Sequence, residues 1–265
     1  MRFSLLNRHM KVFYICLVVI AIYILFFLER RENFSSEAQL YTVKSLSHDG
    51  FGAQYHALMS GIAYCTHKGY TYVHTPFEGV SHGGNAKELN EFTGIRTPMK
   101  PENATNIITE PYSEEVHWSE RPSKYYTDDL IKTLRQYYYN TEKPNISPPE
   151  IALHIRRGDV DSKDGKRFTT NEDNKRVIQM LEQKYPDYMI TIFSEGAEGD
   201  FTDLVSDNVT LKLNGSVTDT FHSFVTAKVL VTAKSSLSYS AAILNENTIY
   251  YQDYWHKPLD HWNKV

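Results

Sequence analysis

The chain has 265 residues and a mass of 30.7 kDa, with 41% hydrophobic and 23% charged residues and two cysteines. This composition is typical of a globular protein and excludes collagen, intrinsically disordered chains and disulfide-rich scaffolds. The first 28 residues carry three basic and no acidic side chains, so the remainder holds 25 basic and 32 acidic ones, a net charge of −7. Because nucleic-acid-binding proteins usually carry a basic face, this balance argues against that class.

An uncharged apolar run covers residues 12–28. Its 17 residues lie at the lower end of what crosses ~30 Å of hydrocarbon, and they exceed the apolar region of about 7 to 15 residues in a signal peptide. We therefore expect a cytoplasmic tail at 1–11, a single transmembrane signal anchor at 12–28 and a polar stem at 29–40. The alternative is a cleaved signal peptide with its cleavage site near residues 36–38.

N-glycosylation sequons occur five times downstream of the apolar run, at Asn33, Asn103, Asn145, Asn208 and Asn214. Such sites are used in the lumen of the secretory pathway, so they favour a lumenal C-terminal part and a type II orientation. Cys65 is the one cysteine after the apolar run, so this part has no internal disulfide and depends on its core for stability.

The first part beyond the stem, residues 41–145, reads as an α/β domain. Its strands are predicted from alternation and its helices from apolar residues at helical spacing. The predicted elements are a strand at 41–47, a helix at 53–67, a strand at 70–75 and a helix at 127–139. Residues 76–126 are rich in Pro, Gly, Asn and Ser and carry weaker elements.

The second part, residues 146–265, is more regular and follows a linker at 140–150 that contains three prolines. Strands are predicted at 151–156, 188–193, 209–213, 228–232 and 248–251, and helices at 171–184, 219–227 and 236–244. Strands that alternate with helices predict a parallel, doubly wound sheet, whose ligands bind beyond the carboxyl ends of the strands. The chemistry is therefore expected in the strand-to-helix loops.

The loop after the strand at 151–156 carries His154, Arg156, Arg157, Gly158 and Asp159. Two adjacent guanidinium groups at the carboxyl edge of a sheet suit a phosphate or pyrophosphate, which accepts bidentate hydrogen bonds. Glycine permits close approach of the backbone, and the aspartate is suited to accept from a sugar hydroxyl, a base N–H or an arginine. The alternative is a surface Arg–Asp pair after an edge strand.

Two further loops have features of a ligand site. Ser235 and Ser236 open the helix at 236–244, where free N–H groups and small hydroxyls form an anion site, or where one serine is simply an N-cap. Gly50, Gly52 and Gln54 lie between the first strand and the first helix. Their pattern suits close contact with a ligand, and a tight turn is the alternative.

Together the three loops resemble those of the GDP-fucose-dependent fucosyltransferases, the superfamily of the α1,2, α1,6 and protein O-fucosyl branches. The H-x-R-R-G-D signature stands at residues 154–159 and a G-x-G-x-Q pattern at residues 50–54, and residues 235–244 echo a serine-rich pattern of the α1,2 branch. The resemblance covers most of the chain beyond the stem. Tyr239 and Ser240 stand where the branch has paired aromatic residues, and the disulfides common in animal members are absent, which leaves the branch open.

The resemblance implies a GT-B fold, two Rossmann-like domains that face each other across a cleft, with the donor held mainly by the C-terminal one. It implies that Arg156 is the main pyrophosphate ligand, supported by Arg157. The other implied donor-binding residues are His154 and Asp159 at the nucleotide, Ser194 and Glu195 at guanosine or ribose, Ser235 and Ser236 at the phosphates, and Gly50, Gly52 and Gln54.

The implied reaction is an inverting transfer of L-fucose from GDP-fucose to a glycan or glycoprotein acceptor in the Golgi or another secretory-pathway membrane. Fixed arginine and helix-end donors stabilise the negative charge that develops on departing GDP, so no metal or other cofactor is expected. Some relatives have a carboxylate about ten residues after the motif histidine, which makes Asp164 the first candidate for the general base. Asp161 and Glu195 are rivals.

Other functions stay open at this level. A catalytically inactive lectin or binding protein would keep the same loops. Residues 157–159 form an RGD tripeptide, as in adhesion proteins, but it abuts an apolar strand. Residues 159–161 form a D-x-D pattern, as in metal-dependent GT-A enzymes; a calcium loop fails because Asp164 occupies the position that requires glycine. The aromatic residues Tyr254, Trp255, His256 and Trp262 near the C-terminus are expected to pack against the C-terminal domain, and the alternative is that they stack on an acceptor sugar.

Overall fold

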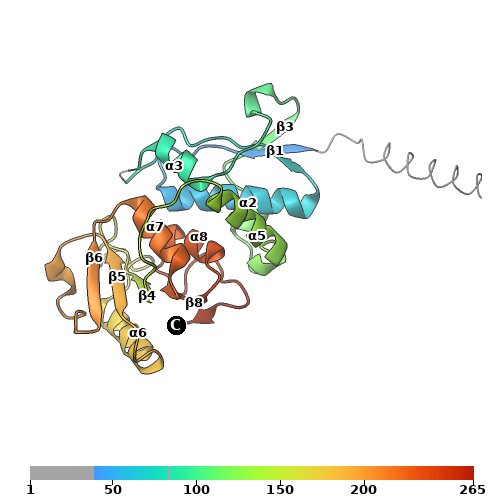
Figure 1. Cartoon of the computed structure of the whole chain (residues 1–265). Helices are drawn as coiled ribbons and strands as arrows, with labels where there is room; N and C mark the ends of the chain where they lie inside the picture. Colours follow the sequence, from blue (N-terminus) through green and yellow to red (C-terminus); the bar gives the residue numbers. More distant parts are fainter. Residues whose placement is uncertain (1–38, 83) are drawn as a thin grey trace, which may run out of the picture. The chain divides into compact units, whose positions relative to one another are not determined.

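The computed structural model describes residues 39–82 and 84–265 (Figure 1). The predicted tail, the predicted anchor and nearly all of the predicted stem lie outside these residues. Among the helices of the described ranges, none combines the length and apolar character needed to cross a membrane. Residues 40–265 form one compact unit, which contains both of the predicted α/β parts.

The N-terminal part is built on a small parallel sheet with the strand order β2-β1-β3. Its strands are β1 (Leu40–Val43), β2 (Thr71–Tyr72) and β3 (Ile107–Glu110). The first two are shorter than predicted, and β3 was not predicted because its residues sit in a segment rich in turn formers. A helix packs on this sheet.

That helix, α2 (Phe51–Lys68), is buried along almost its whole length. It contacts the small sheet on one side and α8 (Ser236–Leu244) of the C-terminal part on another, as Figure 1 shows. A helix that is buried on most of its faces is suited to such a double contact. The remaining N-terminal elements are α3 (Ala86–Thr93), η1 (Pro101–Asn103), α4 (Glu114–His117), η2 (Pro122–Lys124) and α5 (Asp128–Tyr139).

The C-terminal part is a six-stranded, all-parallel sheet with the order β6-β5-β4-β7-β8-β9. Its strands are β4 (Ile151–His154), β5 (Ile190–Ser194), β6 (Val209–Leu213), β7 (Val229–Val231), β8 (Thr248–Tyr251) and β9 (Asn263–Lys264). Its helices are α6 (Asn171–Lys184), the short η3 (Glu198–Phe201), α7 (Val217–Thr226) and α8. The predicted parallel, doubly wound sheet is confirmed, and the strand order changes direction between β4 and β7.

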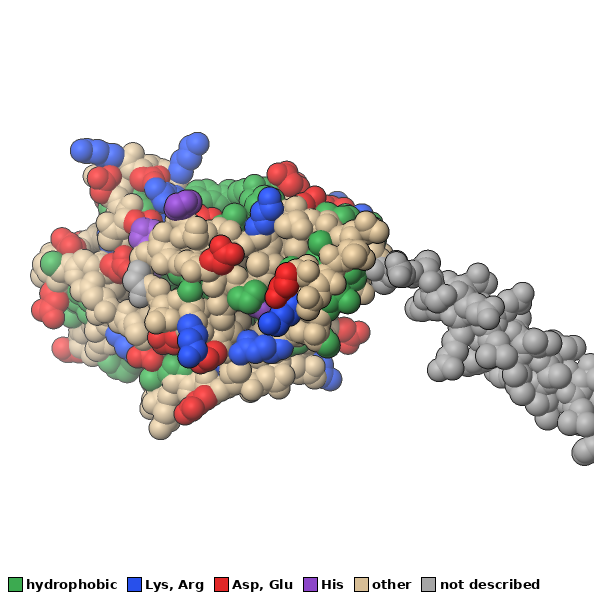
Figure 2. Space-filling model, turned by 90° about the horizontal axis from the view of Figure 1, so that it is seen from above, with side chains coloured by type: hydrophobic (Ala, Val, Ile, Leu, Met, Phe, Trp, Pro, Cys, Tyr) green, Lys and Arg blue, Asp and Glu red, His purple; other side chains and the backbone are tan. Residues whose placement is uncertain are grey.

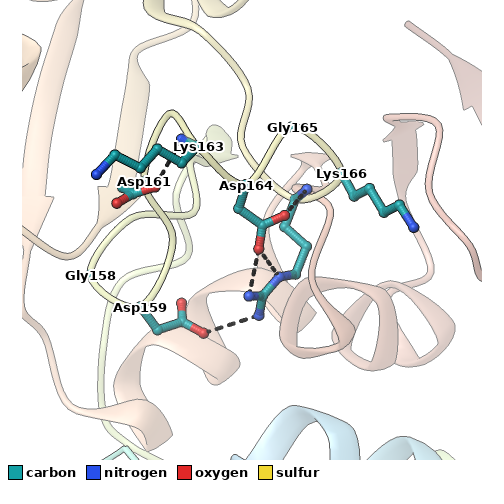
Figure 3. A pocket seen from close by; sticks show the side chains of 8 residues that line it. Gly158, Asp159, Asp161, Lys163, Asp164, Gly165 and Lys166 are labelled. Atoms are coloured by element: carbon teal, nitrogen blue, oxygen red, sulfur yellow. Dashed lines mark hydrogen bonds and ion pairs between the residues drawn. The ribbon is translucent and has the colours of Figure 1, made fainter.

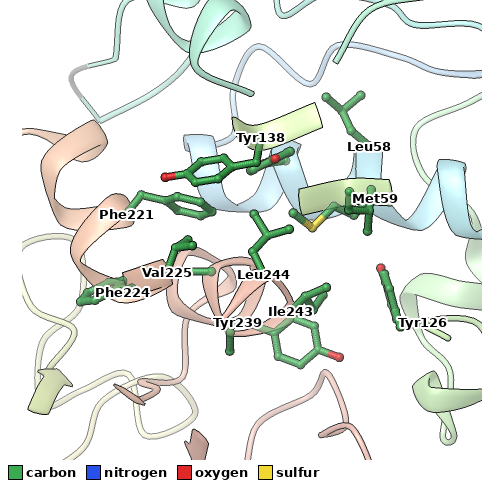
Figure 4. Packing of buried hydrophobic residues seen from close by; sticks show 14 of the residues in the cluster. Leu58, Met59, Tyr126, Tyr138, Phe221, Phe224, Val225, Tyr239, Ile243 and Leu244 are labelled. Atoms are coloured by element: carbon green, nitrogen blue, oxygen red, sulfur yellow. The ribbon is translucent and has the colours of Figure 1, made fainter. Parts of the chain in front are cut away.

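Alternate residues of the central strands enter two different cores, as the pleat of a strand requires. Ile151 and Leu153 of β4 lie in the cluster that includes residues of α6. Ala152, between them, belongs to the cluster that includes α2, α5, α7 and α8. In Figure 4 Tyr138 of α5 lies beside Phe221 of α7 in this second cluster, and their ring centroids are 5.9 Å apart. This second cluster therefore extends without a break from the N-terminal part into the C-terminal part.

The charged residues of the described surface do not form a basic face in the view from above. Figure 2 shows acidic and basic side chains interspersed over this face.

Candidate functional site

A cavity of about 520 Å³ opens at the carboxyl ends of the strands of both sheets. The loops that follow β1, β4, β5, β6 and β7 supply most of its wall, and residues 80–82, Gly84 and the segment after β8 contribute the rest of the described lining. Its size lies in the usual range of small-molecule sites, about 300 to 1,000 Å³. It includes the gap between the ends of β4 and β7, where open α/β sheets bind their ligands.

Three helices begin at the cavity wall. They are α2 after Gly50, α7 after Ser216 and α8 after Ser235, and the first residues of all three line the cavity. Each N-terminus carries unpaired N–H groups and the positive end of the helix dipole. The Gly50 cap of α2 adds no side-chain hydrogen bond. The arrangement produces a positive field suited to an anion.

Arg156 is the central cation of the cavity. Its Nη2 and Nε donate to the carboxylate of Asp159 at 2.7 and 3.2 Å, and its Nη1 donates to the carbonyl of Lys234 at 3.2 Å. The last bond joins the β4 loop to the β7 loop. The guanidinium is 20% exposed and lines the cavity, so it is held in one orientation and remains accessible to a ligand.

Arg157 also reaches the cavity wall, but its hydrogen bonds run into its own loop. Its Nη2 donates to the Thr169 carbonyl and to Asn171 Oδ1, both at 2.9 Å, and its guanidinium lies 4.1 Å from the ring centre of Phe168. These contacts anchor the loop between β4 and α6. The structure therefore gives Arg157 a positioning role beside Arg156.

His154 ends β4 and lies beneath the arginines, 7% exposed. Its Nδ1 is 2.8 Å from the hydroxyl of Ser238, which also accepts the backbone N–H of Ala233. Burial, and then the charge of Arg156, lower the pKa of His154 to about 3. The imidazole is thus neutral near pH 7 and ties the end of β4 to the start of α8.

Ser194 and Glu195 at the end of β5 line the cavity in different ways. The Ser194 hydroxyl donates to the carbonyl of Ile155 at 2.6 Å, which holds the β4 and β5 ends together. The Glu195 side chain is exposed and lies over Gly158, where a Cβ would overlap the Glu195 carboxylate; Gly158 also has a positive φ of 78°. Glu195 therefore presents a carboxylate directly at the cavity.

The serines before α8 take separate roles. Ser235 is the N-cap, because its hydroxyl accepts the N–H of Leu237. Ser236 lines the cavity, and its hydroxyl is 3.3 Å from that of Tyr254.

Gly50 and Gly52 line the cavity as well. A Cβ on Gly52 would overlap the backbone of Leu237, and the Gly52 carbonyl accepts from Ser240 at 3.2 Å. The glycine at position 52 is therefore required for the contact between α2 and α8, a reason that the sequence pattern did not supply.

Gln54 does not face the cavity, contrary to its predicted contact with the donor. The side chain is 2% exposed, its amide N–H groups donate to the carbonyls of Asp49 and Gly79, and its oxygen accepts from Leu46 N. These hydrogen bonds hold the loop after β1 in its conformation.

Asp164, the first candidate for the base, also lies outside the cavity. It lines a shallow outer hollow with Asp161, where its carboxylate is paired with Arg167 (Figure 3). Arg167 extends from this hollow to the cavity and also reaches Asp159 at 3.6 Å. The loop places Asp164 as a partner of a cation, and Glu195 is the one of the three carboxylates weighed as base that lines the cavity.

Several cavity residues had no signal in the sequence. His82 and Arg167 lie in irregular segments outside the motifs, and they reach the wall only through tertiary folding. The aromatic residues near the C-terminus were expected to pack against the C-terminal domain. Trp262 is buried as expected, but Tyr254 and Trp255 line the cavity. Their rings lie 4.0 Å apart, and Trp255 is 41% exposed.

No family model and no curated protein matches the chain. Among solved structures, the E. coli heptosyltransferase WaaC with ADP-2-deoxy-2-fluoro heptose is similar, at 12% identity over 86% of this chain and 92% of that chain, with a TM-score of 0.43. A variant of Arabidopsis thaliana FUT1 in complex with GDP has 11% identity over 86% and 73% of the two chains and a TM-score of 0.44. POFUT1 in complex with GDP has 10% identity over 80% and 74%, with a TM-score of 0.31.

Proposed function

We propose that the protein is an inverting, metal-independent fucosyltransferase that transfers L-fucose from GDP-fucose to a glycan or glycoprotein. The observation that carries the proposal is the convergence of Arg156 and three helix N-termini on one cavity at the carboxyl ends of both sheets. Such a site fits the diphosphate of a sugar nucleotide. The H-x-R-R-G-D motif that supplies Arg156 supports GDP-fucose as the donor.

The proposed chemistry depends on the negative charge that develops on the leaving group. When the bond between fucose and the β-phosphate breaks, negative charge grows on GDP, and Arg156 with the N-terminus of α8 stabilises it without a metal ion. Glu195 is the proposed general base, because its exposed carboxylate lines the same cavity. It would remove the proton from the acceptor hydroxyl as the new bond forms.

The acceptor would approach from the side of the cavity formed by Tyr254 and Trp255. Their rings, which are tilted by 34° to each other, offer an apolar surface of the kind on which a sugar ring packs. We propose further that residues 12–28 anchor the protein in a secretory-pathway membrane with residues 40–265 in the lumen.

The test is a donor screen with the purified chain. Ligand binding to the folded state stabilises it by an amount that grows with the logarithm of ligand concentration over Kd. GDP is expected to raise the melting temperature, and ADP, UDP and CMP to leave it nearly unchanged. Stabilisation by ADP with none by GDP would contradict the GDP-fucose donor. Stabilisation by GDP without transfer to any glycan acceptor would indicate a binding protein instead.

A further inference from the structure

Three histidines from distant segments meet close to Ser236, and none of them lines the cavity. His56 lies in α2, His117 ends α4, and His256 lies in the segment after β8. One ring nitrogen of each lies within 4.8 Å of those of the other two. The ring centroids are 4.3 to 4.6 Å apart. None of the catalytic roles proposed above uses these residues.

The ring nitrogens of this histidine cluster are not all hydrogen-bonded. The Nδ1 atoms of His56 and His117 are buried and have no hydrogen-bond partner among the described residues. His256 differs, because its Nδ1 lies 3.1 Å from the His117 carbonyl. If this nitrogen donates its proton to that carbonyl, Nε2 keeps a free electron pair, as in metal-binding histidines that are oriented by a backbone carbonyl. Buried polar atoms without partners are rare and point to an additional ligand.

The surroundings keep the three imidazoles uncharged. Burial lowers the pKa of His117 to about 3 and that of His256 to about 4, and it places the pKa of His56 well below its usual value. Tyr112 stacks on His117, and Trp118 stacks on His256. Neutral imidazole is the form that binds a metal ion, and a ligand set of nitrogen atoms favours Zn²⁺, Co²⁺, Ni²⁺ or Cu²⁺ over Mg²⁺ and Ca²⁺.

We propose that His56, His117 and His256 bind one Zn²⁺ ion. With Zn–N distances of about 2.0 to 2.1 Å, the nitrogens of a tetrahedral site lie roughly 3.3 Å apart, so the rings need to turn until their ligating nitrogens are closer by on the order of 1 Å. His117 ends a helix of one turn and His256 lies in an irregular segment, and both can make this adjustment. Three protein ligands leave the fourth position open to water.

The ion would fasten the C-terminal segment to the N-terminal part. Tyr254 and Trp255, which directly precede His256, line the cavity, and the Ser236 hydroxyl is 3.5 Å from Nε2 of His256. Cys65 is the one cysteine among the described residues, so the zinc supplies the cross-link that a disulfide provides in other exported proteins. This role is structural and separate from the sugar transfer.

The experiment uses the untagged full chain after removal of metals with a chelator. We expect one Zn²⁺ per chain after reconstitution, a rise in melting temperature with Zn²⁺, and the visible absorption of tetrahedral Co²⁺ when Co²⁺ replaces it. His117→Ala and His256→Ala are each expected to weaken Zn²⁺ affinity by more than about 100-fold, beyond the effect of losing an outer-shell partner. His117→Gln and His256→Gln keep more of the side-chain volume, and circular dichroism reports whether each variant is folded.

The matched control is His74→Ala. His74 is also buried, its pKa is lowered to about 4 by burial, and both of its ring nitrogens lack a partner among the described residues, but it lies outside the cluster. This variant should bind Zn²⁺ with the wild-type stoichiometry and affinity. The proposal is wrong if the wild-type chain takes up neither Zn²⁺ nor Co²⁺, or if folded variants at His117 and His256 bind Zn²⁺ as tightly as the wild type. Because none of these readouts uses GDP, their outcome is independent of the proposed function.

Discussion

At the scale of single residues, the chemistry depends on what each charged group already contacts. Arg156 is paired with Asp159 yet remains at the cavity surface, while Arg157 uses its hydrogen bonds within its own loop. Asp164 is neutralised by Arg167, while Glu195 lines the cavity. Identical residue types therefore take different roles according to their neighbours.

Replacement of Arg156 by alanine should weaken GDP binding by roughly 10- to 100-fold, because a charge-assisted hydrogen bond contributes about 1.5 to 3 kcal/mol. Arg156→Lys should restore only part of the affinity, since lysine cannot form the paired contact. Calorimetric titration with GDP measures both. Arg176→Ala, which removes an arginine with a 65% exposed side chain on α6, is the control, and equal affinity of Arg156→Ala and wild type would refute the assignment.

Glu195→Gln should lower kcat by about 100- to 10,000-fold and leave GDP affinity nearly unchanged, as expected for loss of a general base. Asp164→Asn should keep kcat within a few-fold of wild type, because its carboxylate pairs with Arg167 outside the cavity. Steady-state kinetics with GDP-fucose and a glycan acceptor compare the two. If Asp164→Asn lowered kcat more than Glu195→Gln did, Asp164 would be the general base.

His154 gives a pH prediction. Its pKa in the folded state is lowered to about 3, below the value of about 6.5 for an unfolded histidine. The unfolded chain therefore takes up the proton first as the pH falls, so the stabilising contribution is complete above pH 6.5 and is lost progressively towards pH 3. His154→Asn, which can keep the bond to Ser238, should show a weaker fall in urea midpoint between pH 6.5 and 4. A parallel fall in both proteins would contradict the assignment.

At the scale of the elements, the cavity exists because three helices begin at one place. The contact between α2 and α8 sets this geometry, and it requires a residue without a side chain at position 52. The segments that form α6, α8, β6 and β8 were predicted with their observed bounds, because N-caps, turns or polar loops mark the ends of these apolar or periodic runs. β2 and β3 are short or lie among turn formers, so their pairing with β1 was decided by packing rather than by pattern.

Gly52→Ala should lower the free energy of unfolding by about 1 to 3 kcal/mol, because the added methyl group overlaps the backbone of Leu237 and forces α2 away from α8. Urea unfolding measures the change. Gly199→Ala is the control, since a Cβ there meets nothing within 4 Å. GDP binding should weaken along with stability, because α2 carries part of the cavity wall. An unchanged urea midpoint would contradict the prediction, because it would show that moving α2 away from α8 does not lower the free energy of unfolding.

At the scale of the whole molecule, one continuous hydrophobic core joins the two sheets within residues 40–265. The predicted anchor and the first sequon lie outside the described residues. The other four sequons are at exposed asparagines, which a glycosyl chain can reach.

Expression in mammalian cells should therefore give a protein that loses mass on treatment with an N-glycosidase and stays in the membrane pellet after alkaline carbonate washing. Deletion of residues 1–38 behind a cleavable signal should release it to the medium with its GDP affinity unchanged. The pellet fraction and gel mobility provide the readout. Unglycosylated protein in the cytosol would contradict the proposed orientation.

The sequence by itself determined the parallel α/β class, most elements of the C-terminal sheet, and the loops in which Arg156 and the helix N-termini occur, because these depend on local periodicity and on a rule that holds for all such sheets. Tertiary structure alone decided that Gln54 and Asp164 face away from the cavity, that Tyr254, Trp255 and Arg167 line it, and that His56, His117 and His256 meet. These outcomes depend on contacts between residues far apart in the chain, whose geometry no local pattern encodes.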